Sequence, residues 1–149
     1  MINKQFKAIV LAGGEGKEMR PLSKDYPKTL IKLQGKPILQ YVIENLVKIG
    51  VYDINIIVNE PNRYIHEIQP PNEKIEMKFI KQKEKEIEGA ILSAKEVISK
   101  DENFLLAYGD IIAPTQAYKT LLNTYINRDC DSAILITPKT ETSTYGTPI

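Results

Sequence analysis

The chain has 149 residues, which is the length of one domain with a core of its own. Its 42% of hydrophobic and 26% of charged residues are the balance of a globular protein. With 20 basic and 19 acidic residues the net charge is +1, so no overall field attracts nucleic acid or an anionic membrane. Cys130 is the only cysteine, which excludes an internal disulfide and a thiolate metal cluster. The first apolar run is too short for a secretory signal and none is long enough to span a membrane, so we expect a cytoplasmic protein.

Buried strands alternate with helices along the chain. Residues 7–12 form a continuous apolar run that ends in Gly13-Gly14, which indicates a buried parallel strand. The polar stretch over residues 15–36 is long for a loop, and such loops usually carry function or small helical turns. Pro37 then opens a helix that Gly50 closes.

The same alternation continues to residue 136. In chain order the pattern predicts a strand at 54–58, a helix at 62–69, a strand at 75–80, a helical stripe (Ile87, Ala90, Ile91, Ala94, Val97 and Ile98), a strand at 104–108, a helix from Pro114 and a fifth strand at 132–136. We therefore expect an α/β fold over residues 1–149: a Rossmann-like, doubly wound, mostly parallel sheet of strand order about 3-2-1-4-5, flanked by helices.

In this strand order the first and fourth strands are neighbours. Ligands bind in the crevice above the carboxyl ends of such strands. Gly13, Gly14 and Gly16 follow the first strand and can present N–H groups to phosphate oxygens, although a tight strand exit would also explain them. Asp110 follows the fourth strand, where its carboxylate would either hold Mg²⁺ or cap the next turn.

The glycine turn is followed by a locally basic segment. The glycine turn itself matches neither the P-loop motif nor the dinucleotide-binding fingerprint. The cations of the basic segment would grip a polyphosphate or remain solvated on the surface. They are Lys17, Arg20, Lys24 and Lys28.

Residues 11–46, LAGGEGKEMRPLSKDYPKTLIKLQGKPILQYVIENL, carry a specific motif. They resemble the signature of sugar-phosphate nucleotidyltransferases, L-A-G-G-x-G-T-R-L/M-x-P-L-T followed by P-K and then K-P. Further along, the family's order is continued by Gln82, Gly89-Ala90, Tyr108-Gly109-Asp110 and Tyr145-Gly146. The family transfers a nucleoside monophosphate from an NTP to a sugar-1-phosphate and releases pyrophosphate.

The resemblance implies a role for each matching residue. The nucleotide would be bound by Leu11, Ala12, Gly13, Gly14, Gly16, Gln82 and Gly89. Of these, Gln82 would hydrogen-bond the base, which favours UTP or dTTP. Lys28 would bind phosphate, Asp110 would hold Mg²⁺, and Gly146 would touch the sugar. The implied partners are the NTP and the sugar-1-phosphate, with no nucleic acid and no membrane.

Three departures from the family pattern bear on activity. The family's Thr-Arg is Lys17-Glu18 here, so Lys17 or Arg20 would have to replace an arginine that stabilises the triphosphate. The family's Gly-Thr is Gly89-Ala90, and the family's sugar-binding subdomain has no counterpart in these 149 residues.

Three hypotheses stay open. The first is an enzyme, and the second is a non-catalytic nucleotide-binding paralogue or subunit that acts as a sensor or scaffold. The third is a Rossmann-like module for another mononucleotide. Assembly as a homo-oligomer or with a partner subunit also stays open.

Overall fold

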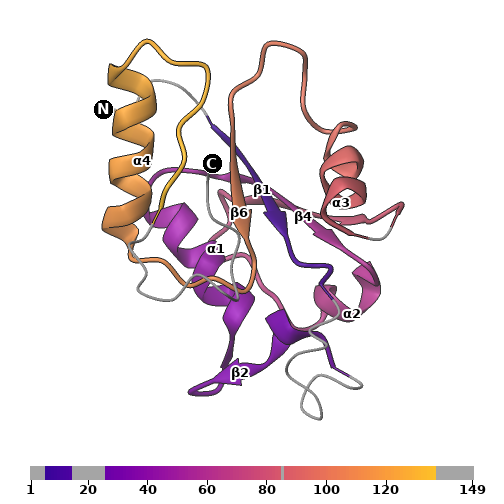
Figure 1. The fold of residues 1–149 in the computed structure, drawn as a ribbon. Helices are drawn as coiled ribbons and strands as arrows, with labels where there is room; N and C mark the ends of the chain where they lie inside the picture. The colour runs from indigo at the N-terminus through magenta and orange to yellow at the C-terminus, as the bar shows by residue number, and fades with distance from the viewer. Residues whose placement is uncertain (1–5, 15–25, 85, 137–149) are drawn as a thin grey trace, which may run out of the picture. The chain divides into compact units, whose positions relative to one another are not determined.

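The computed structural model describes residues 6–14, 26–84 and 86–136 (Figure 1). The chain forms two compact units, Met1–Thr115 and Gln116–Ile149. The first unit holds the sheet, and the second holds most of helix α4 (Thr115–Asn127). Among the helices of the described residues, none combines the length and the apolarity that crossing a membrane requires.

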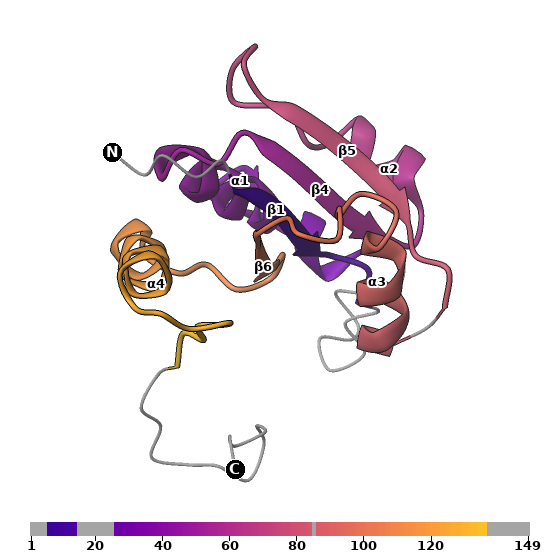
Figure 2. The ribbon, with the colours of Figure 1, turned by 90° about the horizontal axis from the view of Figure 1, so that it is seen from above.

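The first unit is built on four parallel strands. They are β1 (Lys7–Leu11), β4 (Asp53–Val58), β5 (Glu76–Lys81) and β6 (Phe104–Tyr108). Their order is β5-β4-β1-β6, which Figure 2 shows from above. At the carboxyl end of β1, Leu11 pairs with Ile57 on one side and with Tyr108 on the other. The predicted parallel sheet and the order of its first four strands are confirmed.

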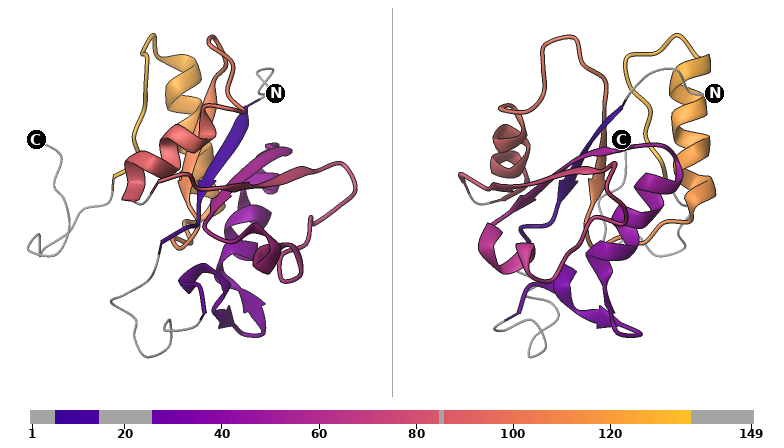
Figure 3. Two further views of the ribbon diagram at one scale, coloured as in Figure 1. Left: turned by 90° about the vertical axis from the view of Figure 1, so that its right-hand side faces the viewer. Right: turned by 180° about the vertical axis from the view of Figure 1, so that it is seen from behind.

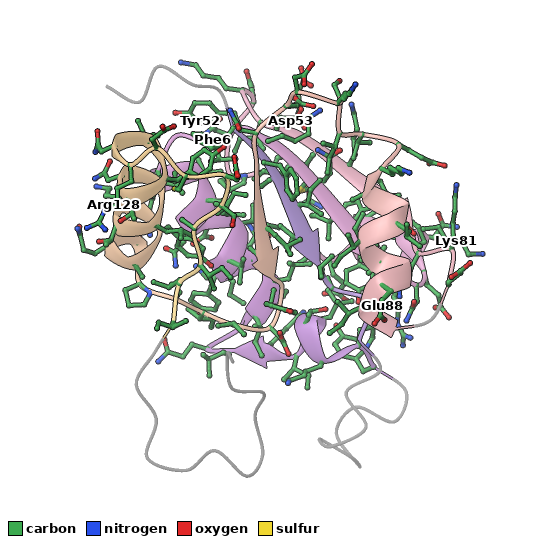
Figure 4. All side chains as sticks on the ribbon, turned by 45° about the horizontal axis from the view of Figure 1, so that its top comes forward. Phe6, Tyr52, Asp53, Lys81, Glu88 and Arg128 are labelled. Carbon is green, nitrogen blue, oxygen red and sulfur yellow. The ribbon has the colours of Figure 1, made fainter. Side chains whose placement is uncertain are left out.

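Because all four strands run the same way, their carboxyl ends meet at one edge of the sheet. Phe6, Tyr52 and Asp53 lie together at the opposite, amino edge (Figure 4). Only groups that follow the strands, or that enter from the loops beyond them, can reach the carboxyl edge.

Two helices cover the two faces of the sheet (Figure 3). Helix α3 (Glu86–Ala94) packs Ala90 and Ala94 against the odd-numbered side chains of β1, which include Ile9 and Leu11. Helix α1 (Ile38–Lys48) covers the other face and buries Leu39, Val42, Ile43 and Leu46. Alternate residues of a strand face opposite sides, so β1 is buried on both faces.

Helix α3 differs from the predicted stripe. It ends at Ala94, while Val97 and Ile98 follow the helix and pack on the same cluster. Ile87 and Ile91 are exposed, at 53% and 45% of their surface. The helix turns its small residues toward the sheet, since only small side chains allow a close approach, and the larger isoleucines are left outside.

The predicted fifth strand at residues 132–136 is wrong. This segment has no regular structure, and Ile134 and Ile136 are exposed at 81% and 71%. A strand exists only where a neighbouring strand accepts its hydrogen bonds, and no described residue pairs with this segment. Among the described residues β6 is therefore an edge strand, with a neighbouring strand on one side only.

Smaller elements connect the strands. The 3-10 turn η2 (Lys28–Leu30) lies within the long polar stretch, where small helical turns were expected. It leads into a hairpin of β2 (Lys32–Leu33) and β3 (Lys36–Pro37), which was not predicted. The hairpin turns at Gln34 and Gly35, whose φ angles of 52° and 81° are both left-handed.

Proline and glycine mark helix ends as the sequence indicates. Helix α1 starts directly after Pro37, and Gly50 adopts a φ of 88° two residues after its end. Helix α4 starts directly after Pro114. The short helix α2 (Pro61–Ile65) starts one residue before the predicted 62–69 helix and ends four residues earlier than predicted.

Candidate active site

The glycine turn and the aspartate turn lie side by side at the carboxyl edge. The backbone N–H of Gly109 donates to the carbonyl of Leu11 at 2.8 Å. A Cβ at Gly109 would lie 3.0 Å from Cβ of Ala12 and 3.1 Å from Cδ1 of Leu39, which is tighter than most contacts of a Cβ in proteins. The expected juxtaposition of the two turns is thus confirmed, and the missing side chain at Gly109 permits it.

Lys28 brings a positive charge to the aspartate turn. Its Nζ lies 2.9 Å from Oδ2 of Asp110, and the two side chains keep 25% and 29% of their surface exposed. The buried neighbours Thr29 and Leu30 anchor the short η2 turn that carries Lys28. The lysine expected to bind phosphate and the carboxylate expected to hold Mg²⁺ are thus in contact with each other.

Gln82 lies against the glycine turn. Its backbone N–H donates to Val58 at 2.8 Å, which places it directly after β5 and beside the end of β4. A Cβ built on Gly13 would lie 2.2 Å from Oε1 of Gln82, so the glutamine side chain occupies the space that Gly13 leaves empty. On the same side, Nδ2 of Asn59 donates to the carbonyl of Gly13.

Gly89 allows α3 to approach the segment that follows β5. A Cβ there would lie 2.4 Å from the carbonyl oxygen of Glu84, a backbone atom. Ser93 fixes this approach, because its Oγ donates to the carbonyl of Gly89 at 2.7 Å and accepts the N–H of Lys83 at 3.0 Å. Ala90 is buried in the core cluster, so its side chain points into the protein core.

A buried polar cluster lies beneath the glycine turn. The Tyr64 hydroxyl donates to the carbonyl of Ala12 at 2.9 Å, and the Thr29 hydroxyl lies 3.2 Å from the Tyr64 oxygen. All three residues are at most 4% exposed. Burial raises the pKa of the Tyr64 phenol above its usual value of 10.0, so the hydroxyl stays protonated and able to donate.

The structure thus collects most of the residues that the sequence suggested. Lys28, Gln82, Asp110 and the segment 11–14 gather at one edge of the sheet. Gly16, Lys17, Arg20 and Gly146 lie outside the described residues.

Three polar contributors, Thr29, Asn59 and Tyr64, were missed. Asn59 directly follows the buried strand β4, so the topological argument that singled out Asp110 could have found it. No local pattern marks Thr29 or Tyr64.

The acidic residues limit how a metal could be held. Within the part of the chain that the structure describes, no three His, Cys, Asp or Glu side chains group together as a metal site. Asp110 offers one partly exposed carboxylate. Mg²⁺ suits such a site, because it commonly takes one or two carboxylates and completes its shell with substrate phosphates and water.

Comparison with known proteins shows which family the chain belongs to. The profile of the nucleotidyl transferase family matches residues 7–147. The chain belongs to this family. The bifunctional protein GlmU of Methanocaldococcus jannaschii is 40% identical over 106 residues, which are 70% of this chain and 25% of the relative.

Other relatives differ in the base that their names specify. The UTP–glucose-1-phosphate uridylyltransferase AglF of Haloferax volcanii is 34% identical over 71% of this chain and 44% of its own length. Mannose-1-phosphate guanylyltransferase 1 of Arabidopsis thaliana is 28% identical over 94% of this chain and 40% of its own length. Family membership therefore leaves the choice of nucleotide open.

A solved structure supports the fold. A UDP-glucose pyrophosphorylase from Acinetobacter baumanii superimposes with a TM-score of 0.70 at 18% identity, over 83% of this chain and 53% of the other. The chain thus spans a quarter to about half of the length of these four proteins.

Proposed function

We propose that the chain binds an NTP, with UTP or dTTP favoured, and transfers its nucleoside monophosphate to a sugar-1-phosphate with release of pyrophosphate. The observation that carries the proposal is the meeting of Gly13, Lys28, Gln82 and Asp110 at one edge of the sheet. These four residues offer the kinds of group that a triphosphate with a base needs: backbone donors, a cation, an amide and a carboxylate.

The proposed transfer requires positioning and charge neutralisation. A phosphate oxygen of the sugar-1-phosphate attacks the α-phosphorus, a new P–O bond forms in line, and the bond to the leaving pyrophosphate breaks. Lys28 would neutralise phosphate charge, which is worth most where little water is present. Mg²⁺, when bound at Asp110, would neutralise charge on the triphosphate.

The amide of Gln82 can pair with uracil or thymine, the bases that the family resemblance favours. It offers one donor and one acceptor in fixed geometry, which match an imide N–H and its neighbouring carbonyl on those bases. Its contact with Gly13 would place the base over the glycine turn.

A thermal-shift series tests nucleotide binding. UTP and dTTP with Mg²⁺ should raise Tm by roughly 5–10 °C at about 100 times Kd, because ligand stabilises only the folded chain. GTP and ATP should raise it less. Release of pyrophosphate on addition of a hexose-1-phosphate then tests the transfer, and a chain whose Tm responds to none of the four nucleotides would contradict the proposal.

One sequence feature favours a second candidate, a nucleotide-binding subunit or sensor without catalysis. Glu18 stands where the family has an arginine that stabilises the triphosphate, and a carboxylate there repels phosphate. Binding without pyrophosphate release would support this candidate, and turnover with a hexose-1-phosphate would exclude it.

The variant Glu18→Arg measures what this position contributes. If residue 18 faces the nucleotide as in the family, the charge reversal should tighten NTP binding roughly tenfold. Glu73→Arg is the matched control, because it makes the same charge change just before β5, at the amino edge of the sheet. Equal affinities for Glu18→Arg and the unmodified chain would show that residue 18 points away from the nucleotide.

A further inference from the structure

Two successive backbone carbonyls at the glycine turn are held by side chains from the β4 side of β1. The Ala12 carbonyl accepts the Tyr64 hydroxyl at 2.9 Å, and the Gly13 carbonyl accepts Nδ2 of Asn59. Asn59 follows β4 directly, and Tyr64 lies in α2, the next element of the chain. Ala12 itself donates its N–H to Ile57 of β4 at 2.9 Å.

Because the peptide bond is planar, the direction of each carbonyl also fixes the direction of the N–H group that follows it. In a trans peptide, the carbonyl and the N–H of the next residue point in opposite directions. The N–H of Gly13 therefore points away from Tyr64, and the N–H of Gly14 points away from Asn59. Because the Leu11 carbonyl meets Gly109 of the aspartate turn, the N–H of Gly13 is directed to the same side of β1.

Consecutive N–H groups that point the same way form a concave donor site for anions. We propose that Tyr64 and Asn59 are positioning residues, which hold the Ala12 and Gly13 carbonyls back so that the N–H groups of Gly13 and Gly14 face the bound nucleotide. The identity of the anion rests on the proposed function, whereas the orientation of the peptides does not.

The Tyr64 contact is built to be rigid. The side chain is 2% exposed, its ring lies 6.1 Å from that of Phe79, and Thr29 contacts its hydroxyl oxygen. A Gly-Gly segment alone has more conformational freedom than any other dipeptide. Fixing its carbonyls before the ligand arrives removes an ordering cost that binding would otherwise include.

Two variants remove one contact each without adding charge. Tyr64→Phe deletes the buried hydroxyl, and Asn59→Leu deletes the amide while keeping a similar size at an exposed position. The matched controls are Tyr118→Phe, which also removes a hydroxyl from a buried tyrosine, and Asn123→Leu, which makes the same change at an exposed site in α4. Because Asn59 is exposed, its variant should fold even if Tyr64→Phe does not.

The first measurement reads the orientation directly in the protein without ligand. The amide signals of Gly13 and Gly14 are followed in nitrogen–proton correlation spectra of the whole chain. Both variants should shift these signals and speed their hydrogen exchange, while both controls leave them in place. Unmoved glycine signals in Tyr64→Phe and Asn59→Leu would overturn the proposal.

The second measurement reads the consequence for binding. Each variant should raise the Kd for UTP with Mg²⁺ roughly tenfold, the effect of losing part of a hydrogen bond to a charged group. Thr29→Ser keeps the hydroxyl and should bind like the unmodified chain, whereas Thr29→Val should bind more weakly. Shifted glycine signals with unchanged affinity would overturn the role in nucleotide binding.

The two measurements separate this inference from the proposed function. If the unmodified chain binds no nucleotide, the proposed function fails. The glycine signals of the unliganded variants then still support or overturn the orienting role of Tyr64 and Asn59.

Discussion

Single residues set the distances at the carboxyl edge of the sheet. Gly109 lets the β6 turn contact Ala12 and Leu39, and Gly13 leaves the space that Gln82 fills. These two glycines are needed for lack of a side chain, since neither has a left-handed φ. Replacing such a glycine with alanine adds one methyl group and tests whether the contact requires the absence of a side chain.

We expect Gly13→Ala to alter nucleotide recognition more than stability. The added Cβ would lie 2.2 Å from Oε1 of Gln82, the far end of a flexible side chain that can move aside at small cost. UTP affinity should fall roughly tenfold, with a change of less than about 1 kcal/mol in the free energy of unfolding. Gly14→Ala is the control for the fold, because its Cβ meets no atom within 4 Å. A displaced Gln82 should appear as a shift of its side-chain amide signal in Gly13→Ala only.

Because Lys28 contacts Asp110, we expect the removal of its charge to change the affinities for a divalent cation and for an NTP in opposite directions. The lysine ammonium competes with a divalent cation for the same carboxylate oxygen, 2.9 Å away. Lys28→Met should therefore tighten Mn²⁺ binding to the nucleotide-free chain roughly three- to tenfold, yet weaken NTP binding through the lost positive charge. Titration calorimetry with Mn²⁺ and with UTP measures both. Lys48→Met, at an exposed lysine in the last turn of α1, should change neither, and weaker Mn²⁺ binding to Lys28→Met would contradict the competition.

At the scale of the elements, α3 is placed by the small residues on its inner face. Gly89, Ala90, Ser93 and Ala94 are all buried, and Ser93 links the helix to Lys83 in the segment after β5. This close approach holds Gln82 near the end of β4. The position of the Gln82 amide therefore depends on the packing of a helix whose larger side chains are turned outward.

For Gly89→Ala two effects oppose each other. Alanine favours a helix over glycine by about 1 kcal/mol. The new Cβ, however, would lie 2.4 Å from the Glu84 carbonyl, a backbone atom that cannot rotate away. Overpacking should win, with a net loss of about 1–3 kcal/mol in the free energy of unfolding measured with urea.

Glu88→Ala controls for the helix propensity in this experiment, because Glu88 is exposed on the same helix. It should change stability by less than about 0.5 kcal/mol. A Gly89→Ala variant that is more stable than the unmodified chain would show that α3 does not approach Glu84 as closely as described.

At the scale of the whole molecule, buried phenols couple stability to alkaline pH. Burial raises the pKa of Tyr64 and of Tyr118 above 10.0 in the folded chain. In the unfolded chain both ionise near 10.0, so the unfolded state loses protons first as the pH rises. Their contribution to stability is therefore complete below about pH 10 and is lost as the pH rises through the folded pKa.

We expect the free energy of unfolding to fall between about pH 8 and pH 11. The fall should be smaller in Tyr64→Phe, which has one buried phenol fewer, even though this variant is less stable at both pH values. Urea unfolding at the two pH values measures the difference. An equal fall in Tyr64→Phe and in the unmodified chain would show that Tyr64 is not a source of this pH dependence.

Periodicity and turn residues were enough to predict the first four strands and their order. The run 8–12 is apolar throughout and the strand 54–58 is apolar except for Asn55, and both are buried in the sheet. The strand predicted at residues 132–136 is absent. An apolar run shows that a segment is suited to a buried strand, but not that a neighbouring strand is available to pair with it. The pattern also failed at Ile87 and Ile91, where a close helix approach selected the small face of α3.

The sequence by itself determined the family, the parallel sheet and the kinds of group that its carboxyl edge carries, because these depend on local order along the chain. Only the tertiary structure decided which of those groups touch. The contact of Lys28 with Asp110 joins residues from different elements, as do those of Gln82 with Gly13 and Tyr64 with Ala12. Such contacts depend on how elements approach one another in three dimensions. That approach is set by glycines, which have no side chain, and by buried hydrogen bonds, and no local sequence pattern predicts either effect.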